Sequence, residues 1–379
     1  MVDVYKKSLK LHKKNQGKLG VVSKVKIKNK KDLSLAYTPG VAEVCRVIAT
    51  DKKMAREYTL KRNTIAVVSD GSAILGLGNL GPEAAIPVME GKAILFKELA
   101  GLNAFPICLD TQDTEEIVKA VKYLAPVFGG INLEDISAPR CFEIEERLKK
   151  ELSIPVMHDD QHGTAVVVLA AMINAMKLKK MDKTKAKIVI SGAGAAGTAI
   201  TKLLLLYGFT NIAVCDSKGL LHEGRADINA AKMELAQITR QEKQADKTLK
   251  EVIKNADVFI GVSGPNVIGA EEVRSMNKKP AVFACANPIP EIMPDQARSG
   301  GAHIVATGRS DFHNQLNNLL VFPGVFRGAL DNKVTQITDQ MLIKAAENLA
   351  RYVKKPSPDN ILPNPLDKGV VRVVARAIR

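Results

Sequence analysis

The chain has 379 residues, 46% of them hydrophobic and 25% charged, and its formal net charge is +15. This length allows two or three domains with a large core, and no apolar run approaches the roughly 20 residues that span a bilayer. The five cysteines are scattered and form no CxxC pair, which argues against disulfides and against a cysteine-built zinc site. Because the N-terminus also lacks the apolar stretch of a secretory signal, we expect a cytoplasmic protein.

Most of the net positive charge lies in one terminal stretch. Residues 1–31 hold eleven lysines against a single acidic residue, Asp3, with no arginine and one aromatic residue, Tyr5. A nucleic-acid surface usually offers arginine side chains and stacking aromatics as well. We therefore interpret the stretch as a solvated, lysine-rich arm, and nucleic-acid binding is the less favoured alternative.

From residue 64 onward, apolar β-rich runs alternate with amphipathic stretches. The apolar runs predict strands at residues 64–69, 104–109, 155–159, 187–191, 211–216, 257–263, 281–286 and 303–308. The amphipathic stretches predict helices near 84–100, at 113–124, from 163 onward and up to about 207. This spacing of strands and helices implies parallel sheets with helical crossovers, and therefore an α/β fold. The polar, basic stretch 177–187 indicates a domain boundary.

A glycine motif, SGAGAAG, follows the predicted strand 187–191 and precedes a helix rich in alanine and leucine. In GxGxxG the first glycine allows a tight turn, the second lets the backbone approach a pyrophosphate, and the third lets helix pack against strand. The helix N-terminus then holds the phosphates, and an acid that ends the next strand accepts from the ribose hydroxyls. The sequence therefore predicts a Rossmann-type dinucleotide site. The residues expected to bind the cofactor are Gly192, Gly194, Ala195, Ala196, Gly197 and Asp216.

The choice of cofactor depends on the end of the strand at 211–216. Asp216 favours NAD, because a carboxylate at this place repels the 2′-phosphate of NADP. Ser217 and Lys218 follow directly and could instead hold that phosphate. We expect NAD to be the better cofactor and NADP to be accepted as well. A second match to the glycine pattern, at 76–81, has no acid-tipped strand at the right distance, so we interpret it as a glycine-rich turn near a site.

Residues 158–162 read HDDQH and run directly into an apolar helix predicted from Gly163. A zinc-protease helix also has two histidines four residues apart with an acid between them, but there both histidines lie in mid-helix. Here His158 ends a strand, which makes a zinc site a poor interpretation. Asp159 or Asp160 could instead cap the helix and favour its positive end. Taken alone, the segment indicates a cap.

A second acidic pair changes this interpretation. Glu134 and Asp135 also follow a short apolar run and precede a helix. The carboxyl ends of neighbouring parallel strands meet at one edge of a sheet, where ligands bind in such folds. Three carboxylates, with water and a substrate oxygen, suit Mg²⁺ or Mn²⁺. The two acidic pairs together therefore predict a site for a hard divalent cation.

Ordered motifs along nearly the whole chain resemble those of the malic enzymes in their small bacterial form. The matching segments are YTPGVAEVC (37–45), SDGSAILGLGNLG (69–81), PVMEGKAILF (87–96), NLEDISAPRCFEIE (132–145), HDDQHGTA (158–165), SGAGAAG (191–197), ANPIPE (286–291) and NNLLVFPGVFRGAL (317–330). The resemblance implies oxidative decarboxylation of L-malate to pyruvate and CO₂, with NAD or NADP and with Mg²⁺ or Mn²⁺. It also implies a domain for substrate, metal and the catalytic tyrosine and lysine over residues 1–160. A Rossmann-type dinucleotide-binding domain with C-terminal helices follows over residues 161–379.

By position, the resemblance assigns roles to individual residues. The implied metal ligands are Glu134, Asp135 and Asp160, with Asp159 as the acid close to the reacting centre. The implied substrate-binding amides are Asn287, which also lies toward the cofactor, Asn317 and Asn318. Lys92 is implied as the general base, which requires that burial or a nearby cation lower its pKa. Tyr37 is implied as the general acid that protonates the enol carbon.

A homodimer is also expected from the resemblance, and in small family members the tyrosine and the lysine can approach the metal from the partner subunit. The helix after Tyr37 carries an apolar stripe that is typical of a core or an interface. The stripe consists of Val41, Val44, Cys45 and Ile48. This chain departs from the large eukaryotic members at one position. They carry an arginine that binds the malate carboxylate, whereas this chain has Ala73 there. The small bacterial forms also lack the arginine.

Two other classes of function stay open. A malolactic-type enzyme or a simple 2-hydroxy-acid dehydrogenase would perform only part of this chemistry. A non-catalytic protein would bind a dinucleotide, or would bind nucleic acid through the lysine-rich arm.

Overall fold

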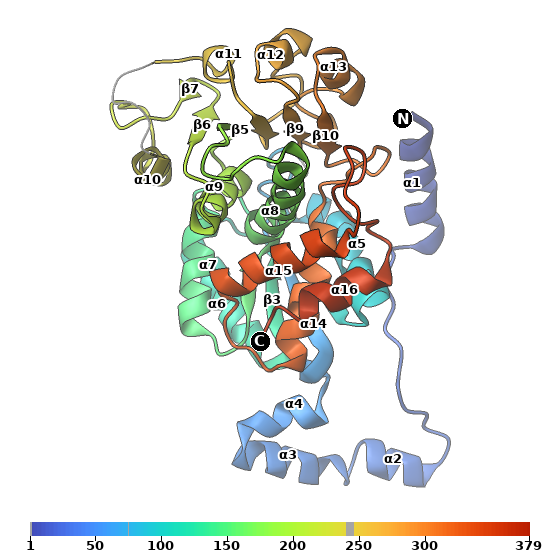
Figure 1. Cartoon of the computed structure of the whole chain (residues 1–379). Helices are drawn as coiled ribbons and strands as arrows, with labels where there is room; N and C mark the ends of the chain where they lie inside the picture. The colour runs from blue at the N-terminus through green and yellow to red at the C-terminus, as the bar shows by residue number, and fades with distance from the viewer. Residues whose placement is uncertain (1, 75, 240–245) are drawn as a thin grey trace.

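The computed structural model describes residues 2–74, 76–239 and 246–379; Leu75 of the glycine-rich turn therefore lies outside the described residues. Two parallel sheets form two units that are stacked in Figure 1, and one long helix, α8 (Asp159–Lys179), runs between them. This arrangement confirms the α/β fold with an N-terminal unit followed by a Rossmann-like unit. The boundary at residue 160 stays a prediction.

The first sheet has the strand order β2-β1-β3-β4, and all its neighbours are parallel. Its strands are β1 (Thr64–Ser69), β2 (Asn103–Cys108), β3 (Gly130–Leu133) and β4 (Val156–His158). Its helices are α5 (Pro82–Ala100), α6 (Thr114–Leu124) and α7 (Arg140–Glu151). Alternate residues of β1 pack toward α5 and toward α6 and α7, so every residue of this strand is buried. A strand that is covered on both faces has a continuous apolar sequence. This explains why the sequence TIAVVS was enough to predict β1.

The second sheet has the order β10-β9-β8-β5-β6-β7, in which only β7 is antiparallel. Its strands are β5 (Ile188–Ser191), β6 (Ile212–Asp216), β7 (Gly219–Leu220), β8 (Val258–Gly261), β9 (Ala281–Ala284) and β10 (Ile304–Thr307). Its helices are α9 (Ala195–Tyr207), α10 (Ala230–Thr239), α11 (Leu249–Val252), α12 (Ala270–Arg274) and α13 (Pro294–Ser299). The predicted strands of this half are confirmed to within two residues at each end.

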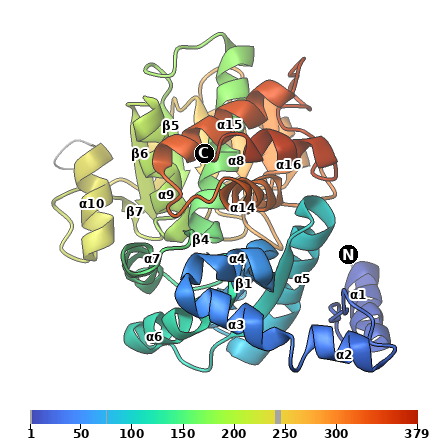
Figure 2. The ribbon, with the colours of Figure 1, turned by 90° about the horizontal axis from the view of Figure 1, so that it is seen from below.

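Three C-terminal helices tie the two units together, as the view from below shows (Figure 2). They are α14 (Phe322–Asp331), α15 (Asp339–Tyr352) and α16 (Lys368–Ala375). The α15 helix packs along α8, whereas α14 and α16 pack against α5 of the first unit. Phe96 of α5 makes edge-to-face contacts with Phe322 and Phe326, at centroid distances of 4.8 and 5.5 Å. The chain after residue 161 is therefore not confined to the dinucleotide-binding unit.

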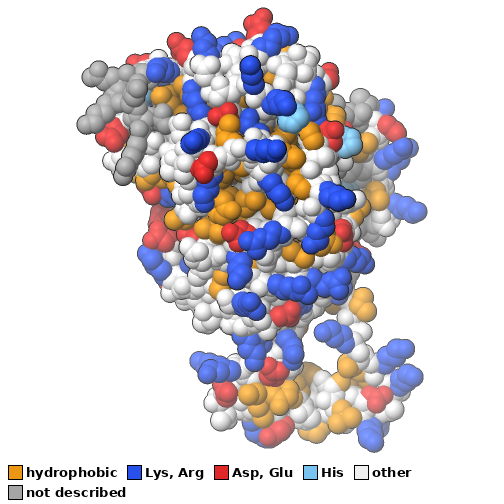
Figure 3. Space-filling view, viewed as in Figure 1, with side chains coloured by type: hydrophobic (Ala, Val, Ile, Leu, Met, Phe, Trp, Pro, Cys, Tyr) orange, Lys and Arg blue, Asp and Glu red, His pale blue; other side chains and the backbone are white. Residues whose placement is uncertain are grey.

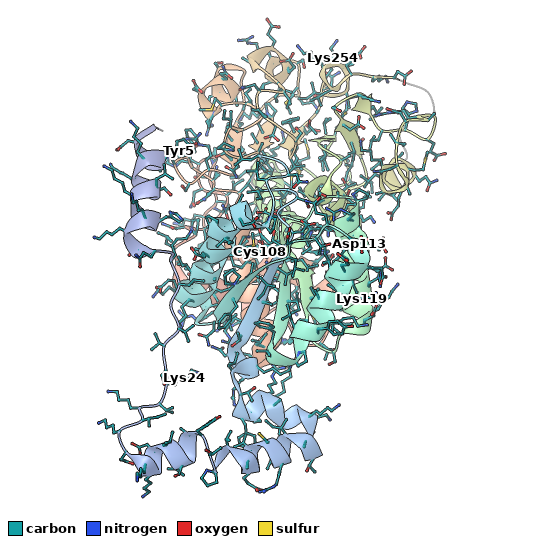
Figure 4. The ribbon with its side chains drawn as sticks, turned by 180° about the vertical axis from the view of Figure 1, so that it is seen from behind. Tyr5, Lys24, Cys108, Asp113, Lys119 and Lys254 are labelled. Atoms are coloured by element: carbon teal, nitrogen blue, oxygen red, sulfur yellow. The ribbon has the colours of Figure 1, made fainter. Side chains whose placement is uncertain are left out.

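The N-terminal residues form an arm that leaves the body of the protein. Its helices are α1 (Val2–Asn15), α2 (Lys30–Ala36), α3 (Val41–Thr50) and α4 (Ala55–Tyr58). The α1 helix lies beside the body, α2 and α3 lie below it, and an extended segment that carries Lys24 joins them (Figures 1 and 4). Neither α2 nor α3 contains a buried residue. No helix within the described residues is long and apolar enough to cross a membrane.

Candidate active site

The site lies at the carboxyl edge of the first sheet, which Cys108 at the end of β2 marks in Figure 4. Glu134 and Asp135 directly follow β3, and Asp160 lies in the first turn of α8, directly after the neighbouring strand β4. One carboxylate oxygen from each of these three residues lies within 4.8 Å of the others. The backbone N–H of Asp135 also donates to Asp160 Oδ2 at 2.8 Å. The structure therefore brings the three predicted ligands together.

The start of α8 differs from the sequence prediction. The helix begins at Asp159 rather than at Gly163, and His158 is its N-cap residue. Gly163 instead lies inside the helix, where Asp159 and Asn318 pack closely against its backbone. A Cβ atom at this position would overlap the Asp159 carboxylate and lie 3.0 Å from Cβ of Asn318. Asp159 and Asp160 thus project from the first turn, where the helix dipole favours negative charge.

Lys92 reaches the acidic cluster from α5 of the same chain. Its Nζ lies 2.9 Å from Glu134 Oε1, is hydrogen-bonded to Asp159 Oδ2, and sits 4.3 Å above the ring centre of Phe322. The residue is only 8% exposed. Burial alone would lower the pKa of Lys92, but the charges of Asp159 and Glu134 outweigh burial and raise it. Lys92 is therefore an ammonium ion in this arrangement, and burial does not supply the lowered pKa that a base requires.

Excess negative charge in the cluster fits a divalent cation. Burial raises the pKa of Glu134 and of Asp159, because a desolvated carboxylate is costly. Burial acts in the same direction on Asp160, but the hydrogen bond from His158 and its charge hold the pKa of Asp160 below its ordinary value. Oδ1 of Asp159 is buried without a hydrogen-bond partner in the described part of the chain. A dication held by Glu134, Asp135 and Asp160 would balance this charge.

The two histidines of HDDQH support the cluster. His158 is fully buried; its Nε2 lies 3.2 Å from Asp160 Oδ2, and its Nδ1 lies 2.9 Å from Nε2 of the Gln161 amide. His162 donates to the buried carboxylate of Glu145 at 2.9 Å. Glu145 also accepts from the backbone N–H of His158 at 2.9 Å, so it fixes the segment from which α8 starts. Sequence reasoning missed Glu145, because it is one of four glutamates in α7 with no distinguishing spacing.

The predicted asparagines come from the other end of the chain and from the second sheet. Asn318 lies beside Gly163, and Asn317 caps the following 3₁₀ turn by accepting from Leu319 N at 2.9 Å. Asn287 follows β9, and its carbonyl oxygen would lie 2.5 Å from a Cβ atom built at Gly76. The glycine-rich turn at 76–81 therefore meets the second sheet at this point, which agrees with its interpretation as a turn near the site.

The dinucleotide motif has the expected geometry. Gly192 has φ +115°, and its backbone N–H donates to Cys215 O at 2.8 Å. A Cβ atom at Gly197 would overlap the carbonyl oxygen of Gly192, whereas a Cβ atom at Gly194 would have nothing within 4 Å. The first and third glycines thus pack the turn, and the second leaves open space at the N-terminus of α9. Asp216 ends β6 beside this turn.

Tyr37 is the one predicted catalytic residue that the structure does not bring to the cluster. It lies between α2 and α3, the helices below the body in Figure 1, and is 63% exposed. Lys92, by contrast, reaches the carboxylates of its own chain. A partner subunit is therefore not required to supply the lysine.

Comparison with known proteins assigns the chain to a family. A family model described as the malic enzyme N-terminal domain matches residues 16–149, and one described as the malic enzyme NAD-binding domain matches residues 161–378. The chain belongs to the malic enzyme family. It is 57% identical to the bifunctional malic/malolactic enzyme of Bacillus subtilis, over 98% of this chain and 91% of the relative. It is 53% identical to the NAD-dependent malic enzyme of Geobacillus stearothermophilus, over 96% and 76% of the two chains.

The crystal structure of the NAD-dependent malic enzyme from Thermotoga maritima has the same fold. It superposes with a TM-score of 0.94 at 49% identity and covers 98% of both chains. The resemblance seen in the sequence motifs is thus confirmed. The two malic enzyme models leave out residues 150–160, so Asp159 and Asp160 lie in the connection between the matched domains.

Proposed function

We propose that the chain catalyses the oxidative decarboxylation of L-malate to pyruvate and CO₂, with reduction of NAD or NADP and with a requirement for Mg²⁺ or Mn²⁺. The observation that carries this proposal is the group of Glu134, Asp135 and the half-buried Asp160, with Lys92 in contact with it. This group lies where Asn287 of the dinucleotide-binding sheet meets the first unit. A hydroxy acid bound between the two would have its hydroxyl near a lysine and its carbon near the nicotinamide.

The proposed roles follow from these positions. The cation, when bound, would polarise the oxygens of malate and add the positive charge near Lys92 that lowers the pKa of an ammonium group. Lys92 takes the hydroxyl proton while hydride leaves for the nicotinamide. Asp159, which is hydrogen-bonded to Lys92, holds the lysine toward the substrate. Asn317 and Asn318 orient the carboxylates, and Tyr37 protonates the enol carbon after CO₂ has left.

The proposed chemistry requires Tyr37, but the chain does not bring Tyr37 to its own acidic cluster. We therefore propose a homodimer in which the arm of one subunit completes the site of the other. The apolar stripe of α3 supports this arrangement, because none of its residues is buried within the chain. Leu35 and Tyr37 beside it are 70% and 63% exposed. Hydrophobic side chains also gather on the lower lobe in Figure 3. A surface of this kind usually marks a protein interface.

Absorbance of the reduced nicotinamide, measured with malate, each cofactor and each cation, tests the proposed activity. Formation of reduced cofactor and of CO₂ from the same malate sample, dependent on Mg²⁺ or Mn²⁺, is the expected result. Release of lactate without net reduction of cofactor would instead support the malolactic alternative, which the bifunctional relative from Bacillus subtilis keeps open. Absence of turnover with every cation would contradict the proposal.

A cytoplasmic location is a further part of the proposal. It rests on the five cysteines, which are all free in the structure and so do not suggest an oxidising compartment.

A further inference from the structure

The side chains around Asp216, at the end of β6, favour a different cofactor from the one that Asp216 alone predicts. We propose that this edge binds the 2′-phosphate of NADP through Lys232 and Lys218, and that Arg225 withdraws Asp216 from ribose recognition. The inference rests on the proposed use of a nicotinamide dinucleotide and deepens it by naming which one the site prefers.

The carboxylate of Asp216 is already fully occupied. Its Oδ1 accepts from the backbone N–H of Lys218 at 2.9 Å and from Arg225 at 2.8 Å. Its Oδ2 accepts from Arg225 at 3.2 Å and from Lys232 Nζ at 2.7 Å. Each carboxylate oxygen has about two acceptor sites, so none is left for a ribose diol. These donors outweigh the effect of burial and hold the pKa of Asp216 at about 2, so the carboxylate stays charged.

Arg225 acts as a clamp between two carboxylates. In addition to Asp216, it donates to both oxygens of Asp227, from Nε and from one terminal nitrogen, at 2.9 Å each. Its side chain is only 8% exposed. The five N–H groups of an arginine are all directed at these two acids and the adjacent backbone carbonyls. Arg225 is therefore a positioning residue that neutralises Asp216, and it has no donor to spare for the cofactor.

Among the described residues, two lysines beside this clamp retain free donors. Lys232 Nζ bonds to Asp216, and Lys218 Nζ bonds to Asp227 at 2.8 Å. An ammonium group has three donors, so each lysine can also hold a phosphate oxygen. Both side chains reach solvent, Lys232 at 29% and Lys218 at 67% exposure. The exposed hydroxyl of Ser217 lies next to Lys218.

The balance of charge at this edge favours a phosphate. Three cations, Arg225, Lys232 and Lys218, surround two carboxylates, Asp216 and Asp227, so the group carries a net positive charge. A dianionic 2′-phosphate is attracted to such a group rather than repelled. The expectation that NAD is the better cofactor assumed a free carboxylate at Asp216, and the structure removes that assumption.

Calorimetric binding of 2′,5′-ADP and 5′-AMP to the full chain, without malate or metal, tests the inference. We expect 2′,5′-ADP to bind at least about tenfold more tightly than 5′-AMP, because the phosphate adds charge-assisted hydrogen bonds. Lys232→Gln and Lys218→Gln should each weaken binding of 2′,5′-ADP about tenfold and leave binding of 5′-AMP unchanged or tighter. Arg225→Gln should move the preference toward 5′-AMP by freeing Asp216, and circular dichroism checks that this variant folds.

Lys202→Gln is the matched control. Lys202 on α9 pairs with Glu234 on α10 at 2.8 Å, close to the site but outside the acid clamp. This variant should change neither affinity by more than about twofold. Equal binding of the two nucleotides by the unaltered chain, or loss of 2′,5′-ADP binding in Lys202→Gln to the same degree as in Lys232→Gln, would overturn the inference. A chain that prefers 2′,5′-ADP but does not oxidise malate would keep this inference and lose the proposed function; a chain that oxidises malate but binds both nucleotides equally would do the reverse.

Discussion

The two halves of the proposed chemistry lie in regions of opposite character. Glu134, Asp135, Asp159 and Lys92 are buried at the edge of a sheet with the half-buried Asp160 beside them, and one chain supplies all of them. Tyr37 lies on the arm, in helices that have no buried residue. The buried region is held by contacts of β3 with β1 and β4, of β4 with α8, and of Lys92 on α5 with Glu134 and Asp159. By contrast, α2 and α3 lie below the body, and none of their side chains is buried.

This difference indicates what a single chain can and cannot do. The buried region is preorganised, so one chain should bind the divalent cation and the cofactor and should position Lys92. The arm lacks the packing that holds a catalytic side chain in place, so we expect Tyr37, the proposed proton donor, to become ordered only against another surface.

The largest effect is expected at the metal ligands. Asp160→Asn should abolish malate turnover and weaken Mn²⁺ binding by at least about 100-fold, because a neutral amide replaces an anionic oxygen while the first turn of α8 keeps its hydrogen-bonding capacity. Steady-state assays and Mn²⁺ titration followed by electron paramagnetic resonance measure both quantities. Asp113→Asn is the control, since Asp113 caps α6 by accepting from Glu116 N at 2.9 Å. Near-normal Mn²⁺ affinity in Asp160→Asn would show that Asp160 only caps the helix and does not bind the metal.

Removing the two proton carriers should give defects of about 10²–10⁴-fold that differ in kind. Lys92→Ala should suppress hydride transfer from malate, yet retain more of the decarboxylation when oxaloacetate and metal are supplied. Tyr37→Phe should bind malate and cofactor but convert enolpyruvate to pyruvate slowly, and it should fold normally because only one exposed hydroxyl is lost. Stopped-flow absorbance with each substrate distinguishes the two variants. Wild-type malate oxidation in both would show that neither residue is catalytic.

A smaller effect, on stability alone, is expected where the buried region is supported. Glu145→Gln should cost about 3 kcal/mol in the free energy of unfolding at neutral pH, because His162, Lys149 and the start of α8 lose a charged acceptor. His162 and Lys149 outweigh burial and hold the pKa of Glu145 well below its ordinary value. The stabilisation is therefore present above the ordinary range of a glutamate and is lost as the pH falls toward the folded-state pKa.

Chemical denaturation at several pH values measures this difference, which should shrink in acid. Glu146→Gln is the neighbouring control, since Glu146 makes an exposed pair with Lys150. It should cost far less stability than Glu145→Gln, because solvent screens an exposed ion pair. Equal costs for the two substitutions would show that Glu145 is not a support of the site.

The smallest effect on the isolated fold is expected in the arm. Val44→Asp should leave the stability of the single chain within about 0.5 kcal/mol, because Val44 packs into no core of its own chain. The same substitution should weaken the dimer, since it places a charge on the proposed contact face. Sedimentation velocity across a concentration series measures the dimer. An unchanged dissociation constant of the dimer would show that α3 is not part of the interface.

Much of the sheet framework and of the acidic cluster could be predicted from sequence. Strands buried on both faces leave long apolar runs such as residues 64–69, and carboxylates that directly follow parallel strands must meet at one edge. The glycine turn at Gly192 was predicted for the same local reason. Its strand, its helix and its acid are set by short-range spacing.

The side-chain partners could not be predicted, because they join distant parts of the chain. Neither the contact of Lys92 with Asp159 nor that of Phe96 with Phe322 leaves a local pattern. Asp216 shows the limit most clearly. Its position was predicted, but Arg225 and Lys232, which change its chemistry, come from a loop and from α10.

Complementation between two inactive chains tests the shared site most directly. A heterodimer of a Tyr37→Phe chain with an Asp160→Asn chain contains one site with an intact acidic cluster from the first chain and an intact tyrosine from the second. If the arm of one subunit completes the site of the other, purified heterodimers should recover about half of the wild-type malate turnover, since one of the two sites is complete. If Tyr37 serves its own chain, neither site is complete, and verified heterodimers would remain as inactive as the two parent variants.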